Sequence, residues 1–255
     1  MRALVLAVIL AGCASSRVAS VDGGDDEDGG RDATAIDAGI DAVPCANSPC
    51  DLYDQCGCSG TASVCDLDPA MIASGATACR SDESGGTEGT VCTRNTTCAA
   101  GHSCVGGRCR RYCEDDATCP GDGGLCILEV TVAGAPIPGV TMCTTDCVPT
   151  QTTNAACPAS WACHVYYDQP GARYLTDCAA PPTSGGATGA TCTRNEDCLP
   201  GLDCISPSTG GMQCRPNCLC VGGNCAAGSC PSGTGSCRGF VTPVMIGAEL
   251  YGTCI

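Results

Sequence analysis

The chain has 255 residues, of which Leu, Ile, Val and Phe together supply only 38, whereas cysteine alone supplies 29. This small apolar content falls below the level at which hydrophobic burial orders a chain of this length. The formal net charge of −15, with 12 Arg and no Lys, argues against a nucleic-acid partner, because phosphates repel an acidic surface.

The N-terminal segment is typical of an exported protein. A basic start precedes an apolar run from Ala3 to Leu10, which is too short to span a bilayer as a helix but suits a cleavable signal. The run ends in Leu10-Ala11-Gly12-Cys13, which resembles the lipobox of bacterial lipoproteins. The resemblance implies that residues 1–12 are removed, that acyl chains on Cys13 hold the chain to the membrane, and, because Ala14 follows, that this is the outer membrane. An ordinary secretory signal with an incidental cysteine is the alternative.

An acidic tether is expected over residues 13–43. Residues 14–43 contain eight acidic residues, two Arg and no aromatic residue, a composition typical of an extended, disordered linker. A calcium loop is the alternative reading of the acidic run 22–29. The required ligand positions fall on Gly24 and Ala35, which cannot supply side-chain oxygens, so the spacer is favoured.

The other 28 cysteines indicate disulfides. No C-x2-C pair occurs, and zinc, iron–sulfur and thioredoxin-type sites usually need one. The cysteines fall into an N-terminal module of six over residues 44–79, a block of twelve over 92–178 and a block of ten over 192–255, with linkers at 80–91 and 179–191. Because each group is even, each can close its own bridges in an oxidising compartment.

Two motifs recur within these groups. Residues 89–104 and 189–204 share a cysteine spacing and the tripeptide Thr-Arg-Asn. A C-x5–6-C-x13–16-C motif recurs at Cys119, Cys157 and Cys230, with a weaker copy at Cys58. Its long interval holds β-branched and aromatic runs around Gly or Pro turns, which predicts hairpins.

The predicted fold class is therefore tandem small disulfide-rich modules of short β-hairpins and loops, with almost no helix beyond the signal segment. Sequence does not determine cysteine connectivity. If the ends of each hairpin pair, the bridges are Cys126–Cys143, Cys163–Cys178 and Cys237–Cys254.

The phrase C-x5-C-x2-G-x2-C followed by C-x3-C resembles Dickkopf N-terminal and EGF-like modules, over roughly residues 92–119 and 192–230. Cysteine-rich surface lipoproteins of bacteria resemble the whole chain. The resemblance implies extracellular recognition or structure, with an extracellular protein or glycan as the partner, and it supplies no catalytic residue.

No catalytic, metal or cofactor site is predicted. His102 and His164 are the two histidines, and each is interpreted as an ordinary surface or half-buried residue. A serine-protease-like Asp-Glu-Ser-Gly-Gly at 82–86 lies in a linker without a matching histidine.

Two groups of arginines are candidate binding residues. Arg94 and Arg194 recur before Asn in the two repeats, where a turn is the simpler explanation. Arg108, Arg110 and Arg111 form a basic cluster beside Tyr112 and suit anion or carboxylate recognition. The aromatic residues of the predicted hairpin around 161–174 are interpreted as core rather than as a contact patch.

The sequence favours a non-catalytic, lipid-anchored, disulfide-stapled module array for adhesion, recognition or envelope structure. A protease inhibitor that presents rigid disulfide-bounded loops is the alternative. An enzyme is the least favoured class.

Overall fold

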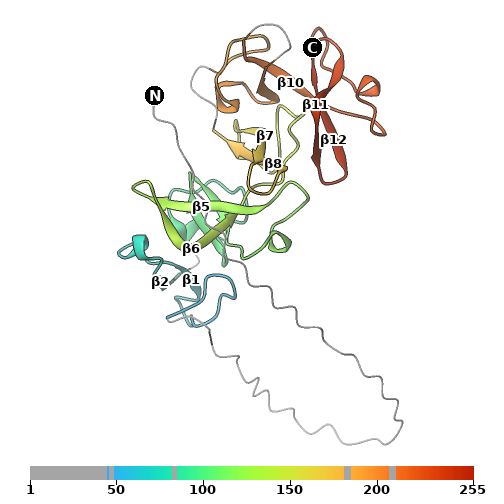
Figure 1. Ribbon diagram of the computed structural model, residues 1–255. Helices are drawn as coiled ribbons and strands as arrows, with labels where there is room; N and C mark the ends of the chain where they lie inside the picture. Colours follow the sequence, from blue (N-terminus) through green and yellow to red (C-terminus); the bar gives the residue numbers. More distant parts are fainter. Residues whose placement is uncertain (1–44, 46–48, 82–84, 181–184, 207–210) are drawn as a thin grey trace, which may run out of the picture. The chain divides into compact units, whose positions relative to one another are not determined.

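The computed structural model of the protein describes residues 45, 49–81, 85–180, 185–206 and 211–255 (Figure 1). The predicted signal segment, Cys13 and the predicted acidic tether lie outside the described residues. Residues from Val43 to Ile255 form one compact unit.

Short antiparallel hairpins make up the described chain, as predicted. Four hairpins form separate two-stranded sheets: β1 (Val64–Leu67) with β2 (Thr77–Arg80), β3 (His102–Val105) with β4 (Arg108–Arg111), β5 (Cys126–Val132) with β6 (Ala135–Cys143), and β7 (Ala162–Asp168) with β8 (Arg173–Ala179). The last sheet has the strand order β11-β12-β10-β9, from β9 (Leu202–Ile205), β10 (Gln213–Leu219), β11 (Cys237–Ile246) and β12 (Glu249–Cys254).

Helical structure in the described ranges is confined to single 3-10 turns. They are η1 (Ile72–Ser74), η2 (Asn95–Thr97), η3 (Asp116–Thr118), η4 (Asn195–Asp197) and η5 (Cys225–Ala227). None of them has the length or the hydrophobicity that crossing a membrane requires. The expected fold class of tandem disulfide-rich hairpins is confirmed.

One four-cysteine unit, which occurs six times in the described ranges, underlies this architecture. In each unit the first cysteine bonds to the third and the second to the fourth, and the third and fourth lie opposite each other on the two strands of a hairpin. The units are 50/58/65/79, 92/98/104/109, 113/119/126/143, 147/157/163/178, 192/198/204/214 and 218/230/237/254. The two motifs seen in the sequence are therefore parts of the same unit, whose second and third cysteines are always six or seven positions apart.

Two further disulfides, Cys45–Cys56 and Cys220–Cys225, complete the fourteen found in the part of the chain that the structure describes. Every bridge joins two cysteines of the same sequence group. Such a density of disulfides requires an oxidising compartment, so the protein is exported.

The expected pairing of hairpin ends is wrong. Cys126 lies opposite Cys143, but Cys126 bonds to Cys113 and Cys143 bonds to Cys119. The other two predicted bridges are wrong in the same way. Cys163 bonds to Cys147 and Cys178 bonds to Cys157, instead of to each other. Likewise, Cys237 bonds to Cys218 and Cys254 bonds to Cys230. Side chains at opposite positions lie side by side on one face, with Cβ atoms farther apart than most disulfides allow. Both sulfurs therefore reach the preceding loop and fix it against the hairpin.

Two hairpins, β3–β4 and β9–β10, are not among those that the sequence predicts. They have the shortest intervals between the third and fourth cysteines of a unit. In β3–β4 the strands are polar and only four residues long, so they lack the apolar pattern of a strand. The turn between them is Gly106-Gly107, with φ of 64° and 85°. That pair is a recognised two-residue hairpin turn, and it is the signal that identifies this strand pair.

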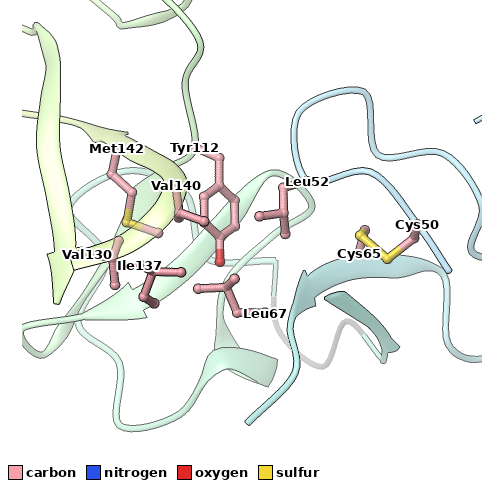
Figure 2. Close-up of a cluster of buried hydrophobic side chains, with 9 residues drawn as sticks. All are labelled: Cys50, Leu52, Cys65, Leu67, Tyr112, Val130, Ile137, Val140 and Met142. Atoms are coloured by element: carbon pink, nitrogen blue, oxygen red, sulfur yellow. A yellow bond between two sulfur atoms is a disulfide. The ribbon is translucent and has the colours of Figure 1, made fainter. Parts of the chain in front are cut away.

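An aliphatic core joins the N-terminal units (Figure 2). Tyr112 lies among Leu52, Leu67, Val140 and other side chains from the first unit and the β5–β6 hairpin. The Tyr112 hydroxyl donates to Asp66 Oδ1 at 2.6 Å, which satisfies the buried oxygen atoms of both. Most of the other clusters of buried residues consist of disulfide cysteines, as the low aliphatic content requires. A smaller apolar cluster, of Val244, Ile246 and Tyr251, lies in the last sheet.

Candidate functional site

A buried polar cluster joins the second and third cysteine groups. His164 on β7 is 0% exposed, and its Nδ1 lies 2.7 Å from Oδ1 of Asp203 on β9. The other carboxylate oxygen of Asp203 accepts from Asn217 Nδ2 at 2.7 Å and from Val165 N at 3.2 Å. Because a carboxylate accepts hydrogen bonds, Nδ1 of His164 carries the proton.

The expectation that His164 is a surface or half-buried residue is therefore wrong. His102 is half-buried, as expected. The reason for the difference is non-local, since His164 is buried by strands that begin about 40 positions later in the sequence. Nothing in the residues around His164 identifies Asp203 as its partner.

The His164–Asp203 pair has two members of a catalytic triad but lacks a nucleophile. Nε2 of His164 is buried, and no side chain or backbone group in the described chain hydrogen-bonds to it. A triad requires a hydroxyl or thiol at that nitrogen. The pair thus orients and cross-links two units.

A pocket of about 430 Å³ lies directly beside this cluster, and we call it the aromatic pocket. Its walls come from β7, β8, η4, β9, β10 and β11. The rings that line it are Tyr166, Tyr167, Tyr174 and Phe240, and its polar groups are Asn195, Asp203, Asn217 and Thr242. A concave site with apolar walls and a few fixed polar groups is the usual form of a ligand-binding site.

Two features of the aromatic pocket favour contact with a ligand. Tyr167 is 49% exposed, and its ring lies 4.9 Å from the ring of Tyr174 between centroids. Val241, at the rim, is fully exposed. By contrast Tyr166 is fixed, because its hydroxyl donates to Glu196 Oε1 at 2.7 Å; burial and this bond raise its pKa well above the ordinary value.

The aromatic residues of this hairpin therefore serve both as core and as surface. Tyr166 and Tyr174 are half-buried, and Trp161 packs against a disulfide cluster. Tyr167 instead presents its ring to solvent. The interpretation of the hairpin aromatics as core alone misses the exposed ring.

The basic cluster predicted as an anion site is divided by the alternation of β4. Arg108 and Arg110 are 1% and 7% exposed, whereas Arg111 is exposed on the other face. Both buried guanidinium groups bond to Asp177 on β8, from Arg108 Nη2 at 2.8 Å and from Arg110 Nη2 at 2.7 Å. The cluster does recognise a carboxylate, and that carboxylate belongs to the same chain.

The repeated Arg-Asn pairs are placed at turns, as the simpler explanation predicts. Asn95 and Asn195 open η2 and η4, and their Oδ1 atoms accept from Cys104 N and Cys204 N. Arg94 and Arg194 lie one residue earlier, in separate units, so the structure does not combine them into one site. Arg194 is paired with Asp197 and Glu196 on the surface.

Groups of three cysteine sulfurs, such as those of Cys92, Cys98 and Cys109, lie within 4.8 Å of one another. Adjacent disulfides of one four-cysteine unit produce this geometry. Oxidised sulfur is not the thiolate that a metal ion binds. In the named groups, therefore, the disulfides account for the sulfur clusters.

No protein-family model, no curated protein and no solved structure matches this chain. The likeness to Dickkopf N-terminal and EGF-like modules accordingly remains one of cysteine spacing.

Proposed function

We propose that this protein is a non-catalytic recognition module, held at the bacterial outer membrane by acyl chains on Cys13 and displayed on its acidic tether. The aromatic pocket is the observation that carries the proposal. Disulfides fix the strands that form it, so a ligand meets a preorganised site, and preorganisation reduces the entropic cost of binding.

A glycan is the ligand class that this pocket suits best. An exposed ring such as Tyr167 offers a flat apolar surface to the apolar face of a sugar, while the exposed Thr242 offers a hydroxyl to hydrogen-bond with the sugar. The volume of about 430 Å³ suits one or two sugar residues. Exposed surfaces on rigid scaffolds are where recognition usually occurs.

Binding of residues 45–255 to an array of envelope and extracellular glycans tests this proposal. Tyr167→Ala and Val241→Ala should each weaken binding of any glycan that the unaltered protein captures. Val221→Ala is the matched control, since Val221 is also an exposed valine but does not line the aromatic pocket. Equal loss in all three variants, or no glycan captured, would reject the aromatic pocket as a glycan site.

The lipid anchor is tested separately on the full chain. Metabolic labelling with a fatty acid should mark the unaltered protein, and Cys13→Ser should abolish both the label and the partition into detergent. A labelled Cys13→Ser protein would exclude Cys13 as the acylated residue.

Protease inhibition is a second candidate function, favoured by one observation. Val241 is fully exposed where the pairing of β11 with β12 shifts register between Gly239 and Val244, and Cys237 and Cys254 fix the ends of this hairpin. A protruding segment with fixed ends suits insertion into a protease cleft. Assays against serine proteases that cleave after small aliphatic residues test this function. Val241→Arg should transfer any inhibition to trypsin-like enzymes, a change that glycan recognition does not predict.

A further inference from the structure

Two buried arginines share one carboxylate, that of Asp177, which is mostly buried. Arg110 donates from Nη2 and Nη1 to Asp177 at 2.7 and 3.2 Å, and Arg108 donates from Nη2 to the same carboxylate at 2.8 Å. Glu88 lies close enough to Arg110 to interact with its charge, but its carboxylate accepts from Arg111 N and from the Thr145 hydroxyl rather than from either buried guanidinium group. Two guanidinium groups thus bond to a single carboxylate, and a buried cation that is incompletely paired favours an additional anion.

The guanidinium of Arg108 also has an unused donor. Its Nη1 is buried and has no hydrogen-bond partner in the described part of the chain. The guanidinium lies over the Trp161 ring, with 5.1 Å between Cζ and the ring centroid, which is a cation–π contact. A carboxylate accepts such an N–H in a short, charge-assisted bond.

A cavity of about 360 Å³ adjoins these groups, and we call it the tryptophan cavity. Arg108, Arg110 and Trp161 line one part of it. The remaining wall is largely apolar, with Val105, Leu128 and Val130 among its residues. The tryptophan cavity therefore combines a cationic region with an apolar surface large enough for a short hydrocarbon or aromatic body.

Glu129 lines the same cavity and is exposed to solvent. Its carboxylate opposes a second negative charge on a ligand. The cavity therefore favours a ligand with one negative charge, which the arginines attract, and an apolar body. Glu129 disfavours a ligand with two negative charges.

We propose that the tryptophan cavity binds a small amphipathic monocarboxylate, whose carboxylate accepts hydrogen bonds from Arg108 and whose apolar body packs against Trp161, Leu128 and Val130. The site is separate from the aromatic pocket and does not depend on glycan recognition. Trp161 lines the same cavity as Arg108, so a ligand bound there should change the environment of its ring.

Trp161 is the single tryptophan of the chain, which makes its fluorescence a site-specific probe. Octanoate should change the emission of the oxidised protein in a saturable titration. Octan-1-ol lacks the charge, acetate lacks the apolar body and suberate carries a second charge, so each should bind at least about tenfold more weakly. An equal response to octanoate and octan-1-ol would overturn the carboxylate assignment.

Two variants, assayed by calorimetry so that the readout is independent of Trp161 emission, place the site. Arg108→Gln should weaken octanoate binding about tenfold to a hundredfold, because it removes the donor and its charge. Leu128→Phe keeps the arginines but narrows the cavity, so it should also weaken binding, and it tests the proposal if Arg108→Gln does not fold. Arg238→Gln, at an exposed arginine of β11 outside the cavity, should leave binding unchanged. Unchanged affinity in folded Leu128→Phe, or equal loss in Arg238→Gln, would reject the tryptophan cavity.

Discussion

The Nδ1 atom of His164 lies 2.7 Å from Oδ1 of Asp203, and both side chains are almost completely buried. The two residues belong to different cysteine groups, between which no disulfide passes. Asn217 and the backbone N–H of Val165 complete the hydrogen bonds of the same carboxylate. This non-covalent link is therefore a principal contact that holds the aromatic pocket together.

Replacement of Asp203 by Ala should strongly destabilise the link. It leaves the buried Nδ1–H of His164 without an acceptor and leaves Asn217 Nδ2 with only the long bond to the Pro149 carbonyl, at 3.5 Å. Breaking a buried pair in this way typically costs about 3–5 kcal/mol. Urea unfolding with the disulfides intact, followed by the fluorescence of the tyrosines at the aromatic pocket, measures the change.

The matched control for this prediction is the other histidine. His102 is half-buried and its Nδ1 lies 3.0 Å from the carbonyl oxygen of the neighbouring Ala100, so His102→Ala should cost less than about 1 kcal/mol. An Asp203→Ala protein as stable as His102→Ala would mean that water or a rearranged side chain replaces the missing carboxylate.

Local patterns in the sequence predicted much of the fold, and contacts between units supplied the rest. The β-branched run 127–132 and its counterpart at 140–142 form β5 and β6 because hairpin formation depends on neighbouring residues. The alternation of β4 would have shown that Arg108 and Arg110 share a face opposite to Arg111. Which face is buried depends on Asp177, about 70 positions away, and no pattern in a single sequence indicates that contact.

The pairing of the cysteines also depends on contacts that local sequence patterns do not show. An even number of cysteines in each group is visible in the sequence, but six cysteines already allow fifteen pairings. Position along a hairpin identified correctly that Cys126 and Cys143 are neighbours. It could not show that each sulfur reaches back to a loop cysteine, because that depends on the path of the chain before the strand.

Disulfides that enclose long segments should stabilise the fold more than those that enclose short ones. Replacing Cys119 and Cys143 by Ala opens a bridge with a sequence separation of 24, whereas the Cys220–Cys225 bridge has a separation of 5. Chain entropy gives a loss of about 3.5 kcal/mol for the first double variant and about 2 kcal/mol for the second. Urea unfolding of the two double variants makes the comparison.

Mass spectrometry of unreduced proteolytic fragments checks the pairing on which this prediction rests. A fragment that links Cys119 to Cys143 is expected. A fragment that links Cys126 to Cys143 would contradict the four-cysteine unit.

The stability of the protein should depend on pH through Glu88. Burial raises the pKa of this carboxyl above its ordinary value of 4.5, and the bonds from Arg111 N and Thr145 only partly offset that effect. A raised folded-state pKa means that the folded protein binds the proton more tightly than the unfolded chain. Its stabilising contribution is therefore complete below the unfolded pKa and is lost as pH rises through the folded pKa.

Glu88→Gln should remove this part of the pH dependence, because the amide does not titrate: its oxygen can accept from Arg111 N while its NH2 donates to the Thr145 hydroxyl. Urea midpoints measured from pH 3.5 to 7 should fall less with rising pH in the variant than in the unaltered protein. Glu114→Gln, at an exposed glutamate, should follow the unaltered protein. A Glu88→Gln curve parallel to that of the unaltered protein would show that Glu88 does not contribute.

The two sequence repeats provide an internal control for the contact between units. Asn95 and Asn195 each accept a hydrogen bond from the backbone N–H of a cysteine nine positions later, at 3.3 and 3.0 Å. Asn195 also donates from Nδ2 to the Val165 carbonyl on β7 at 2.6 Å, a bond that Asn95 does not make within the described chain. Asn195→Ala should therefore cost about 1 kcal/mol more in unfolding free energy than Asn95→Ala, the net value of one additional hydrogen bond.

Asn195→Ala should also loosen the aromatic pocket, which Asn195 lines, so that any glycan binding weakens in this variant and persists in Asn95→Ala. Equal losses of stability in the two variants would show that both asparagines act only on their own turns.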